Sequence, residues 1–296
     1  MTPVVIMGCG YVGERLARTL QARGQRVLAV VRSADRAEAL RTRGIETLQA
    51  DLDTGQGLDP IPLMGALVLH SVPPPNQGER DPRTQHLAAA FRRNPPERIV
   101  YLSTTGVYGD RGGAIVDDLT PPAPATDRAR RRLDAEEQLR ALEGETGVPV
   151  VVLRVPGIYG PGRLPLQAIR AGQPLIRPEE AGPGNRIHVD DLVALCAAAL
   201  EHGPGGETYN VGDGDHRSMT DFFQAVADAA GLPHPPSMGM DEAEGHLSPM
   251  MLSFLKESRS VRSARGLADL GVQLRYPRME AGIRASLEEE NVGHAG

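Results

Sequence analysis

The sequence is poor in the residues that cross-link small secreted domains or ligate zinc. Among 296 residues it has two cysteines, Cys9 and Cys196, and no Cys-x-x-Cys pair. This pattern argues against a disulfide scaffold and a cysteine-rich zinc site, and we expect no metal centre. Tryptophan is absent and aromatic residues make up only 3% of the chain, which argues against a stacking platform for bases or sugar rings.

Lysine is nearly absent as well. Lys256 is the only one, so almost all of the 32 basic residues are arginine, and the 38 acidic residues give a net charge of −6. A mildly acidic chain without a basic run is a poor candidate for binding nucleic acid or a membrane surface. No apolar run approaches the roughly 20 residues of a membrane span, and the first residues lack the pattern of a signal peptide. We therefore expect a cytoplasmic protein.

The first half of the chain alternates short apolar runs with helical segments. Strands are predicted at 3–7, 26–31, 45–49, 66–70, 98–103 and 149–155, and helices at 14–23, 34–43, 80–93 and 126–142. The last of these helices has Thr126 as its expected N-cap and Gly144 beyond its expected end. Continuous apolar strands that alternate with helices predict an α/β fold, a Rossmann-type doubly wound parallel sheet.

The second half has a different texture. Glycine, proline and arginine are frequent in residues 157–184, and helices are predicted at 189–201, 220–230, 261–270 and 278–289. A short strand is expected at 208–211 and an irregular loop at 233–245. We expect residues 1–156 to form the sheet domain, with some later segments returning to it. Residues 157–296 should form a small α+β cap over the carboxyl edge of the sheet, where ligands bind in such folds.

A glycine-rich loop joins the first predicted strand to the first predicted helix, with the sequence Gly8-Cys9-Gly10-Tyr11-Val12-Gly13. It fits Gly-x-Gly-x-x-Gly in the strand–turn–helix context that makes this motif specific for dinucleotides. Gly8 permits the tight turn, Gly10 lets the backbone approach a pyrophosphate, and Gly13 allows helix and strand to pack closely. The sheet domain is therefore predicted to bind NAD(P).

The end of the second strand favours NADP over NAD. An NAD site would place Asp or Glu there to hold the ribose 2′-hydroxyl, whereas this chain has Arg32 followed by Ser33. A guanidinium fork can hold a 2′-phosphate, and a serine hydroxyl can add a hydrogen bond. The alternative is that Arg32 is only a solvated residue at a strand end.

Several further motifs occur in a fixed order, at 50–52, 101–109, 153–161, 186–192 and 208–214. With them the chain resembles the extended short-chain dehydrogenase/reductase superfamily of the NAD-dependent epimerase/dehydratase type, essentially from end to end. The resemblance implies that Asp51 and Leu52 contact the adenine and that Ser103 and Pro156 lie at the cofactor. It also implies that Thr104 donates a hydrogen bond to the reacting oxygen, which is sensible chemistry for a hydroxyl at a strand end. The alternative is a threonine that only satisfies nearby backbone.

The chain departs from that family at the Tyr-x-x-x-Lys pair of the long helix. If Glu136 is the family's Glu, Arg132 occupies the Lys position and Arg128 the Tyr position. None of the six tyrosines lies on this helix, and Lys256 is far away in the sequence. Arg132 can keep the positive charge and the ribose contact. Arg128 cannot donate a proton, because its pKa exceeds about 12. The same arginines can equally be the solvated face of a helix.

Any hydride transfer would then need another proton source. The candidates are Thr104 with a water, Tyr108, His188 or a nearby carboxylate, although structural roles are the commoner outcome for Tyr108 and His188. Substrate contacts are expected from the cap, with His188 and three arginines as candidates: Arg163, Arg177 and Arg186.

The departure resembles a divergent bacterial branch of the superfamily that has an arginine-rich helix in place of the Tyr/Lys pair. We expect an NADP-dependent oxidoreductase or epimerase-like enzyme that acts on a small polar substrate, with a nucleotide-linked one as an option. The alternatives are a cofactor-binding regulator or scaffold without redox chemistry, and an isomerase without net redox. A homodimer through helices 80–93 and 126–142 is left open.

Overall fold

A parallel sheet of seven strands forms the centre of the molecule. The computed structural model describes residues 2–243 and 258–294. The strands lie in the order β11-β7-β5-β4-β1-β2-β3, and every neighbouring pair is parallel. Their bounds are β1 Val4–Met7, β2 Val27–Val31, β3 Glu46–Gln49, β4 Leu67–His70, β5 Arg98–Thr104, β7 Val150–Val155 and β11 Thr208–Asn210. Strands that are buried on both faces explain the continuous apolar runs of the sequence.

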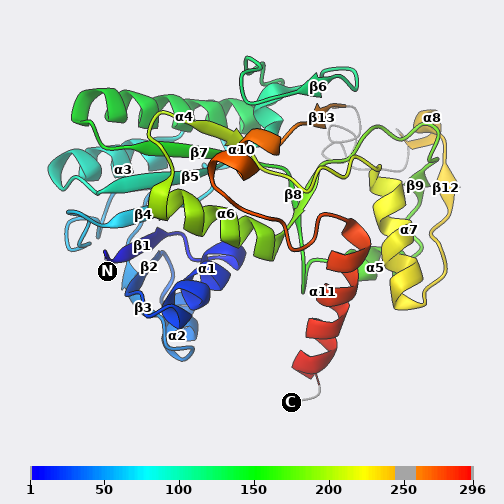
Figure 1. The fold of residues 1–296 in the computed structure, drawn as a ribbon, viewed down its shortest axis with the longest axis horizontal. Helices are drawn as coiled ribbons and strands as arrows, with labels where there is room; N and C mark the ends of the chain where they lie inside the picture. The colour runs from blue at the N-terminus through cyan, green and yellow to red at the C-terminus, as the bar shows by residue number, and fades with distance from the viewer. Residues whose placement is uncertain (1, 244–257, 295–296) are drawn as a thin grey trace.

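Helices cover both faces of this sheet (Figure 1). One face packs against α1 Tyr11–Ala22, α2 Ala34–Arg41 and α6 Val189–His202, and the other against α3 Pro82–Arg93 and α4 Asp127–Thr146. Each helix contributes an apolar stripe, for example Leu16 and Leu20 on α1 and Leu139 and Leu142 on α4. The predicted doubly wound α/β fold is therefore confirmed.

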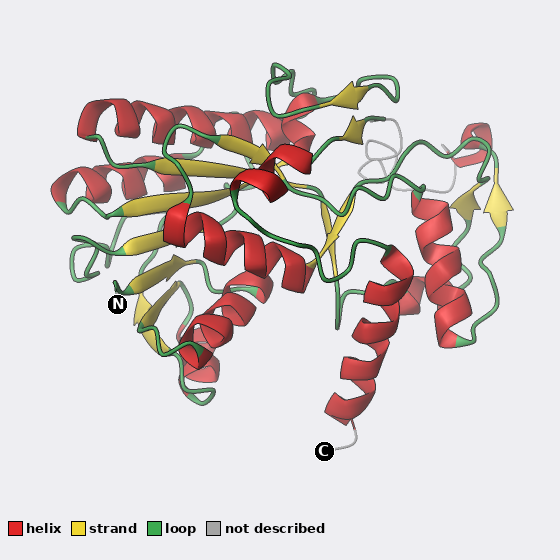
Figure 2. Cartoon of the chain, viewed as in Figure 1, coloured by secondary structure: helices red, strands yellow, loops and turns green. Residues whose placement is uncertain are grey.

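Most of the remaining elements form a cap beyond the carboxyl ends of the strands (Figure 2). They are η1 Thr105–Tyr108, β6 Ile115–Val116, β8 Gly157–Tyr159, α5 Leu166–Arg170, β9 Leu175–Ile176, β10 Arg186–His188, α7 Met219–Ala230, β12 Ser237–Met238, α8 Met240–Ala243, β13 Ser260–Val261 and α11 Met279–His294. Helix α10 Ala264–Asp269 packs instead beside β11, on the sheet domain. Three two-stranded sheets connect segments of the cap that are distant in sequence. They pair β8 with β10, β9 with β12 and β6 with β13. A separate apolar cluster joins α5, α7 and α11 around Tyr159.

Several predicted boundaries are wrong. Helix α1 starts at Tyr11 rather than at residue 14, and α11 ends at His294 rather than at residue 289. Helix α4 continues past Gly144 and ends at Thr146. Its C-cap is Gly147, whose φ of +73° is the left-handed conformation that glycine adopts most readily. Residues 261–270 hold the end of β13 and the short helix α10 rather than one helix. The predicted loop at 233–245 contains β12 and α8 in its described part, up to residue 243.

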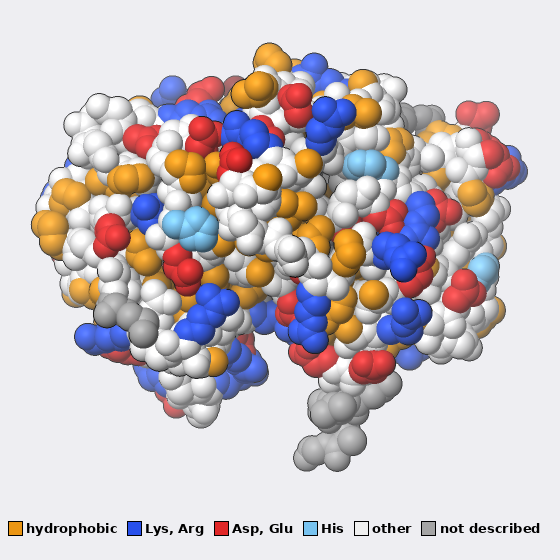
Figure 3. All heavy atoms as spheres, viewed as in Figure 1, with side chains coloured by type: hydrophobic (Ala, Val, Ile, Leu, Met, Phe, Trp, Pro, Cys, Tyr) orange, Lys and Arg blue, Asp and Glu red, His pale blue; other side chains and the backbone are white. Residues whose placement is uncertain are grey.

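Strand β11 and helix α6 lie beyond residue 156 in the sequence but belong to the central layers. The boundary at 156 itself stays a prediction. Within the described residues, no helix combines the length and the apolar character that crossing a bilayer would require. On the face drawn in Figure 3, basic and acidic side chains are interspersed over both the sheet domain and the cap.

Candidate functional site

A first cavity, of about 390 Å³, lies at the carboxyl ends of β1, β2 and β3. Its lining includes the first glycines of the glycine loop, the ends of these strands and the segment that follows β4. The predicted cofactor residues among its lining are Gly8, Gly10, Arg32, Ser33, Asp51 and Leu52. We call it the dinucleotide cavity.

The glycine loop has the geometry that a pyrophosphate requires. Gly8 has a φ of +87°, and a Cβ there would lie 2.7 Å from the Val72 side chain. A Cβ on Gly13 would meet Ile6 and the Gly8 carbonyl at 3.0 and 3.1 Å, whereas one on Gly10 would meet nothing within 4 Å. Gly10 is the N-cap of α1 and supplies no side-chain cap. The loop therefore leaves room for phosphate above the helix N-terminus, with Tyr11 and Val12 in its first turn.

Charged side chains surround the outer part of this cavity. Arg32 donates to Asp53 at 3.1 Å, and Arg83 makes a fork to the same carboxylate at 2.5 and 2.9 Å. Arg36 lines the cavity too and donates to the Cys9 carbonyl. Ser33 caps α2 by accepting from the Arg36 N–H at 3.3 Å. The arginine and serine singled out by sequence thus lie at this cavity, together with two further arginines.

Asp51 and Leu52 follow β3 at the same edge of the sheet. Asp51 lines the dinucleotide cavity, and one carboxylate oxygen accepts from the Asp53 N–H at 2.9 Å. Within the described residues, no side chain or backbone N–H donates to the other oxygen. Asp51 therefore caps this turn, and adenine recognition by Asp51 and Leu52 stays a prediction.

A second cavity, of about 520 Å³, opens where β5 and β7 end, beneath the cap. We call it the substrate cavity. Thr104 and Arg128 both line it, with Pro156, Thr126 and Thr220, and loop 181–185 forms one wall. Its charged lining residues, within the part of the chain that the structure describes, are Arg128 and Arg259. Two guanidinium groups and several hydroxyls favour an anionic, oxygen-rich ligand.

Local geometry explains why Thr104 and Arg128 meet. Thr104 ends β5, and its Oγ1 accepts from the Gly106 N–H at 3.2 Å, which starts the turn η1. Its own hydroxyl hydrogen is left to donate elsewhere. Thr126 caps α4 as predicted, by accepting from the Ala129 N–H at 3.2 Å. This cap places Arg128 in the first turn, on the side of the substrate cavity.

Two further arginines of α4, Arg131 and Arg132, are anchored to backbone carbonyls. Arg132, which is predicted to occupy the family's Lys position, donates to the Leu102 carbonyl at 2.8 Å and to the Tyr101 hydroxyl at 3.3 Å. Arg131 is buried and donates to the Gly78 carbonyl. The alternative of a purely solvated face is wrong for these two residues, whose guanidinium groups tie α4 to β5 and to the loop before α3. A ribose contact of Arg132 stays a prediction.

A buried polar network lies directly behind Thr104. Glu136 accepts a fork from Arg154 at 3.1 and 2.7 Å and a bond from Ser103 at 2.5 Å. Arg154 also donates to Tyr108, whose hydroxyl bonds Asn210. Ser103 and Tyr108 therefore use their hydroxyls inside the structure, which agrees with the structural alternative for Tyr108. A cofactor contact of Ser103 stays a prediction.

The substrate candidates of the cap lie outside the described lining of the substrate cavity. His188 is buried, caps α6 and lies 3.2 Å from Ser286, and burial lowers its pKa to about 4. Arg186 is buried and donates to the backbone of Asp215, Arg217 and Ser218. Arg163 stacks on the ring of Tyr11 at 4.1 Å. Substrate binding by these residues, and by Arg177, which pairs with Glu180, stays a prediction.

Sequence reasoning missed the other residues at the two cavities, chiefly Arg36, Asp53, Arg83, Thr220 and Arg259. Arg36 could have been found, because it lies in the first turn of helix α2, just after Arg32 and Ser33. Arg83 and Arg259 gave no signal: arginine is abundant in this sequence, and only the fold brings these two to the sheet edge.

Comparisons with known proteins agree with this arrangement. Residues 4–212 match the NAD dependent epimerase/dehydratase family. Protein YeeZ of Escherichia coli K12 is 28% identical, over 94% of this chain and 97% of its own length. The structure of a functionally unknown conserved protein from Silicibacter pomeroyi DSS superposes with a TM-score of 0.86 at 34% identity, over 98% of this chain and 99% of that one.

A second solved structure shows the fold alone. It is UDP-glucuronic acid 4-epimerase from Bacillus cereus, in complex with NAD, which is 17% identical with a TM-score of 0.76, over 98% of this chain and 99% of that one. The family match covers most of the chain and includes the glycine loop and every strand of the central sheet. This chain belongs to the NAD-dependent epimerase/dehydratase family, in the extended short-chain dehydrogenase/reductase superfamily.

Proposed function

We propose that this protein is an NADP-preferring oxidoreductase or epimerase-like enzyme with an atypical active site, acting on a small polar anionic substrate. The observation that carries the proposal is the shared position of Thr104 and Arg128 in the substrate cavity. Family membership supports NAD(P)-dependent chemistry in general, and a nucleotide-linked substrate is one chemistry that two guanidinium groups suit.

The preference for NADP rests on charge. Arg32, Arg36 and Arg83 line the dinucleotide cavity, and a 2′-phosphate carries the double negative charge that such a cluster favours. Gly8, Gly10 and the uncapped start of α1 fit the pyrophosphate. When bound, the nicotinamide would supply or accept a hydride.

We propose that residues of the chain itself stabilise the charge that develops on the substrate. Thr104 would donate its hydroxyl hydrogen to the reacting oxygen and so stabilise negative charge that develops there. Arg128 would add positive charge at the position where the family has tyrosine, without giving up a proton. A water molecule is then the proton source that we propose.

The cofactor preference is tested first by titrating the protein with NADPH and, separately, NADH, and following nicotinamide fluorescence. The absence of tryptophan keeps protein emission low. We expect NADPH to bind more tightly by tenfold or more. Binding of neither dinucleotide would refute the proposal.

The role of Thr104 is tested by substitution. Thr104→Ala should lower turnover of an anionic carbonyl or nucleotide-sugar substrate at least tenfold, since it removes the hydrogen bond to the reacting oxygen. NADPH affinity should stay the same. Thr104→Ser is the matched control, because it keeps the hydroxyl and should keep most of the activity. Equal activity of the Ala and Ser variants would contradict the assigned role.

The second candidate is a non-catalytic NADP(H)-binding regulator or scaffold, which the replacement of Tyr and Lys by Arg128 and Arg132 favours. It predicts cofactor binding with no turnover in any substrate screen.

A deuterated cofactor distinguishes an enzyme with net redox chemistry, which transfers deuterium to the product, from an isomerase without net redox. We also propose a cytoplasmic protein without nucleic-acid or membrane partners, and a homodimer through α3 and α4 that sedimentation velocity would test.

A further inference from the structure

Three charged side chains from three different elements meet at the rim of the dinucleotide cavity. Arg32 follows β2, Asp53 lies in the turn after β3, and Arg83 lies in the first turn of α3. The Asp53 carboxylate receives the Arg83 fork at 2.5 and 2.9 Å and Arg32 at 3.1 Å. All three residues line the cavity. A carboxylate bridging two guanidinium groups is the arrangement that a phosphate in the same place would form.

The two arginines are held very differently. Arg83 is 17% exposed and has a second anchor, the Pro73 carbonyl at 2.8 Å. Arg32 is 68% exposed, and within the described residues its guanidinium group pairs with Asp53 alone. The Arg83 hydrogen bonds lower the pKa of Asp53, so this group is a carboxylate at neutral pH. Arg32 is therefore the member of the trio that can leave Asp53 for a ligand.

From this geometry we propose that Asp53 is a specificity-determining residue. It acts as an internal substitute for the 2′-phosphate of NADP, and it holds Arg32 and Arg83 in position while it weakens discrimination for NADP over NAD. The proposal rests on the proposed preference for NADP. On binding, Arg32 turns from Asp53 to the 2′-phosphate, and the Asp53 carboxylate stays beside that phosphate as a repelling charge.

A substitution can remove the charge of Asp53 and still keep the size and shape of its side chain. Asp53→Asn keeps an oxygen that accepts from Arg83, and the Pro73 carbonyl keeps Arg83 in place. Asp53 is 37% exposed, so the substitution should leave the fold intact. Asp59→Asn is the matched control: it removes one negative charge from the same loop, where Asp59 is 87% exposed and pairs with Arg93 away from the cavity.

The experiment is calorimetric titration of the full-length protein with 2′,5′-ADP and with 5′-AMP, which differ in the 2′-phosphate alone. Asp53→Asn should bind 2′,5′-ADP about threefold to tenfold more tightly, because a like charge next to a phosphate dianion is removed. Its affinity for 5′-AMP, and both affinities of Asp59→Asn, should equal those of the wild type. In the Arg32→Ala background the gain from Asp53→Asn should shrink, because Asp53 acts partly through Arg32.

Other results overturn the inference. Unchanged or weaker binding of 2′,5′-ADP by Asp53→Asn would show that Asp53 does not compete with the phosphate. An equal change for both nucleotides would show a structural role only. A wild type that binds 5′-AMP as tightly as 2′,5′-ADP would refute the NADP preference itself, and a wild type that binds neither would refute the proposed function.

Discussion

At the residue scale, the most demanding feature of the site is the ion pair of Glu136 and Arg154 behind Thr104. Both side chains are almost fully buried, and two hydrogen bonds, of 3.1 and 2.7 Å, join them. A buried charge is tolerated only where a partner and hydrogen bonds offset its desolvation. Ser103 and Tyr108 complete that set. The network joins α4, β5 and β7, and so fixes the strand end that carries Thr104.

Removing one member should therefore be costly. Glu136→Ala should lower the free energy of unfolding by about 3–5 kcal/mol, since it leaves the Arg154 charge buried without its counterion. Urea unfolding of the variant and the wild type measures this. Glu145→Gln, which removes an exposed partner of Arg92 at the end of the same helix, is the control and should leave the unfolding midpoint in place. A comparable loss in both variants would contradict the argument.

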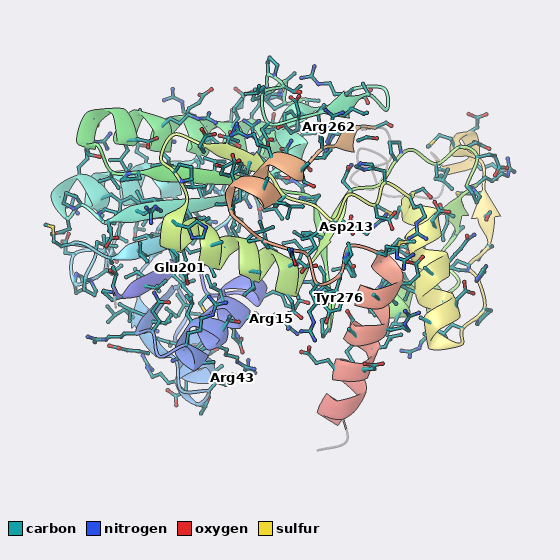
Figure 4. The ribbon with its side chains drawn as sticks, viewed as in Figure 1. Arg15, Arg43, Glu201, Asp213, Arg262 and Tyr276 are labelled. Atoms are coloured by element: carbon teal, nitrogen blue, oxygen red, sulfur yellow. The ribbon has the colours of Figure 1, made fainter. Side chains whose placement is uncertain are left out.

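Asp213 gives a pH-dependent prediction. It lies between the sheet and helix α11 (Figure 4), and burial raises its pKa from 3.8 to about 7, with Arg186, Asp215 and Asp191 nearby. The folded protein thus holds this proton more tightly than the unfolded chain, and the stabilisation is lost as pH rises from about 4 to about 7.

Asp213→Asn removes this dependence. The urea midpoints of the variant and the wild type are measured at pH 5 and at pH 7.5. The difference in stability, variant minus wild type, should be larger at pH 7.5 than at pH 5. The comparison between the two pH values cancels any constant effect of the substitution. A difference between variant and wild type that is the same at both pH values would refute the prediction.

At the scale of elements, the turn between β1 and α1 decides whether the dinucleotide cavity exists. Gly8 is in the left-handed region, with no space for a Cβ beside Val72. Gly24, after α1, has a similar φ of +78° but open space around it. Alanine at Gly24 would therefore show the effect of backbone strain alone, whereas alanine at Gly8 would add a steric clash.

Alanine at either glycine should cost about 1–2 kcal/mol through the strained φ alone. Gly8→Ala should lose more than this and should also lose 2′,5′-ADP binding, because the turn must move away from Val72. Gly24→Ala should bind 2′,5′-ADP normally. Urea unfolding and calorimetric titration measure the two effects, and normal nucleotide binding by Gly8→Ala would be the contrary result.

At the scale of the whole molecule, the cap is fastened to the sheet domain by buried polar contacts. Asp191 of α6 accepts from the backbone N–H groups of Arg275 and Tyr276 at 2.7 and 3.0 Å. Tyr276 lies just before α11, close to the junction of the two parts (Figure 4). His188 adds a contact to Ser286 of α11.

Asp191→Ala should loosen this junction. Two N–H groups would lose their acceptor. The local cost is about 1–3 kcal/mol for the buried N–H of Tyr276 and less for the partly buried N–H of Arg275. Hydrogen exchange followed by mass spectrometry should show faster exchange in residues 275–290 and little change in β1 to β5. Asp190→Ala, which removes a half-exposed partner of Arg15, should have a smaller effect. Uniformly faster exchange over the whole chain would contradict a local role.

The strands, the central helices and the glycine loop were predictable because their signals are local. Apolar runs, the Thr126 cap and the spacing of Gly8, Gly10 and Gly13 depend on residues close together in sequence. The carboxyl end of α4 and the short elements of the cap were mispredicted for the opposite reason. A glycine such as Gly144 is tolerated inside a helix that packs well, and strands of two residues form only because a distant segment pairs with them.

The sequence by itself determined the fold class, the family motifs and the absence of the Tyr/Lys pair. Each of these depends only on which residues are present and on the spacing between residues close together in sequence. The sequence also singled out Arg32 and Arg128, but only the tertiary structure showed which other arginines reach the two cavities. The fold brings Arg128 and Arg259 to the substrate cavity, and Arg32 and Arg83 to one carboxylate, Asp53. Composition cannot reveal this, because a charged side chain takes its role from the distant segments that the packed sheet places beside it.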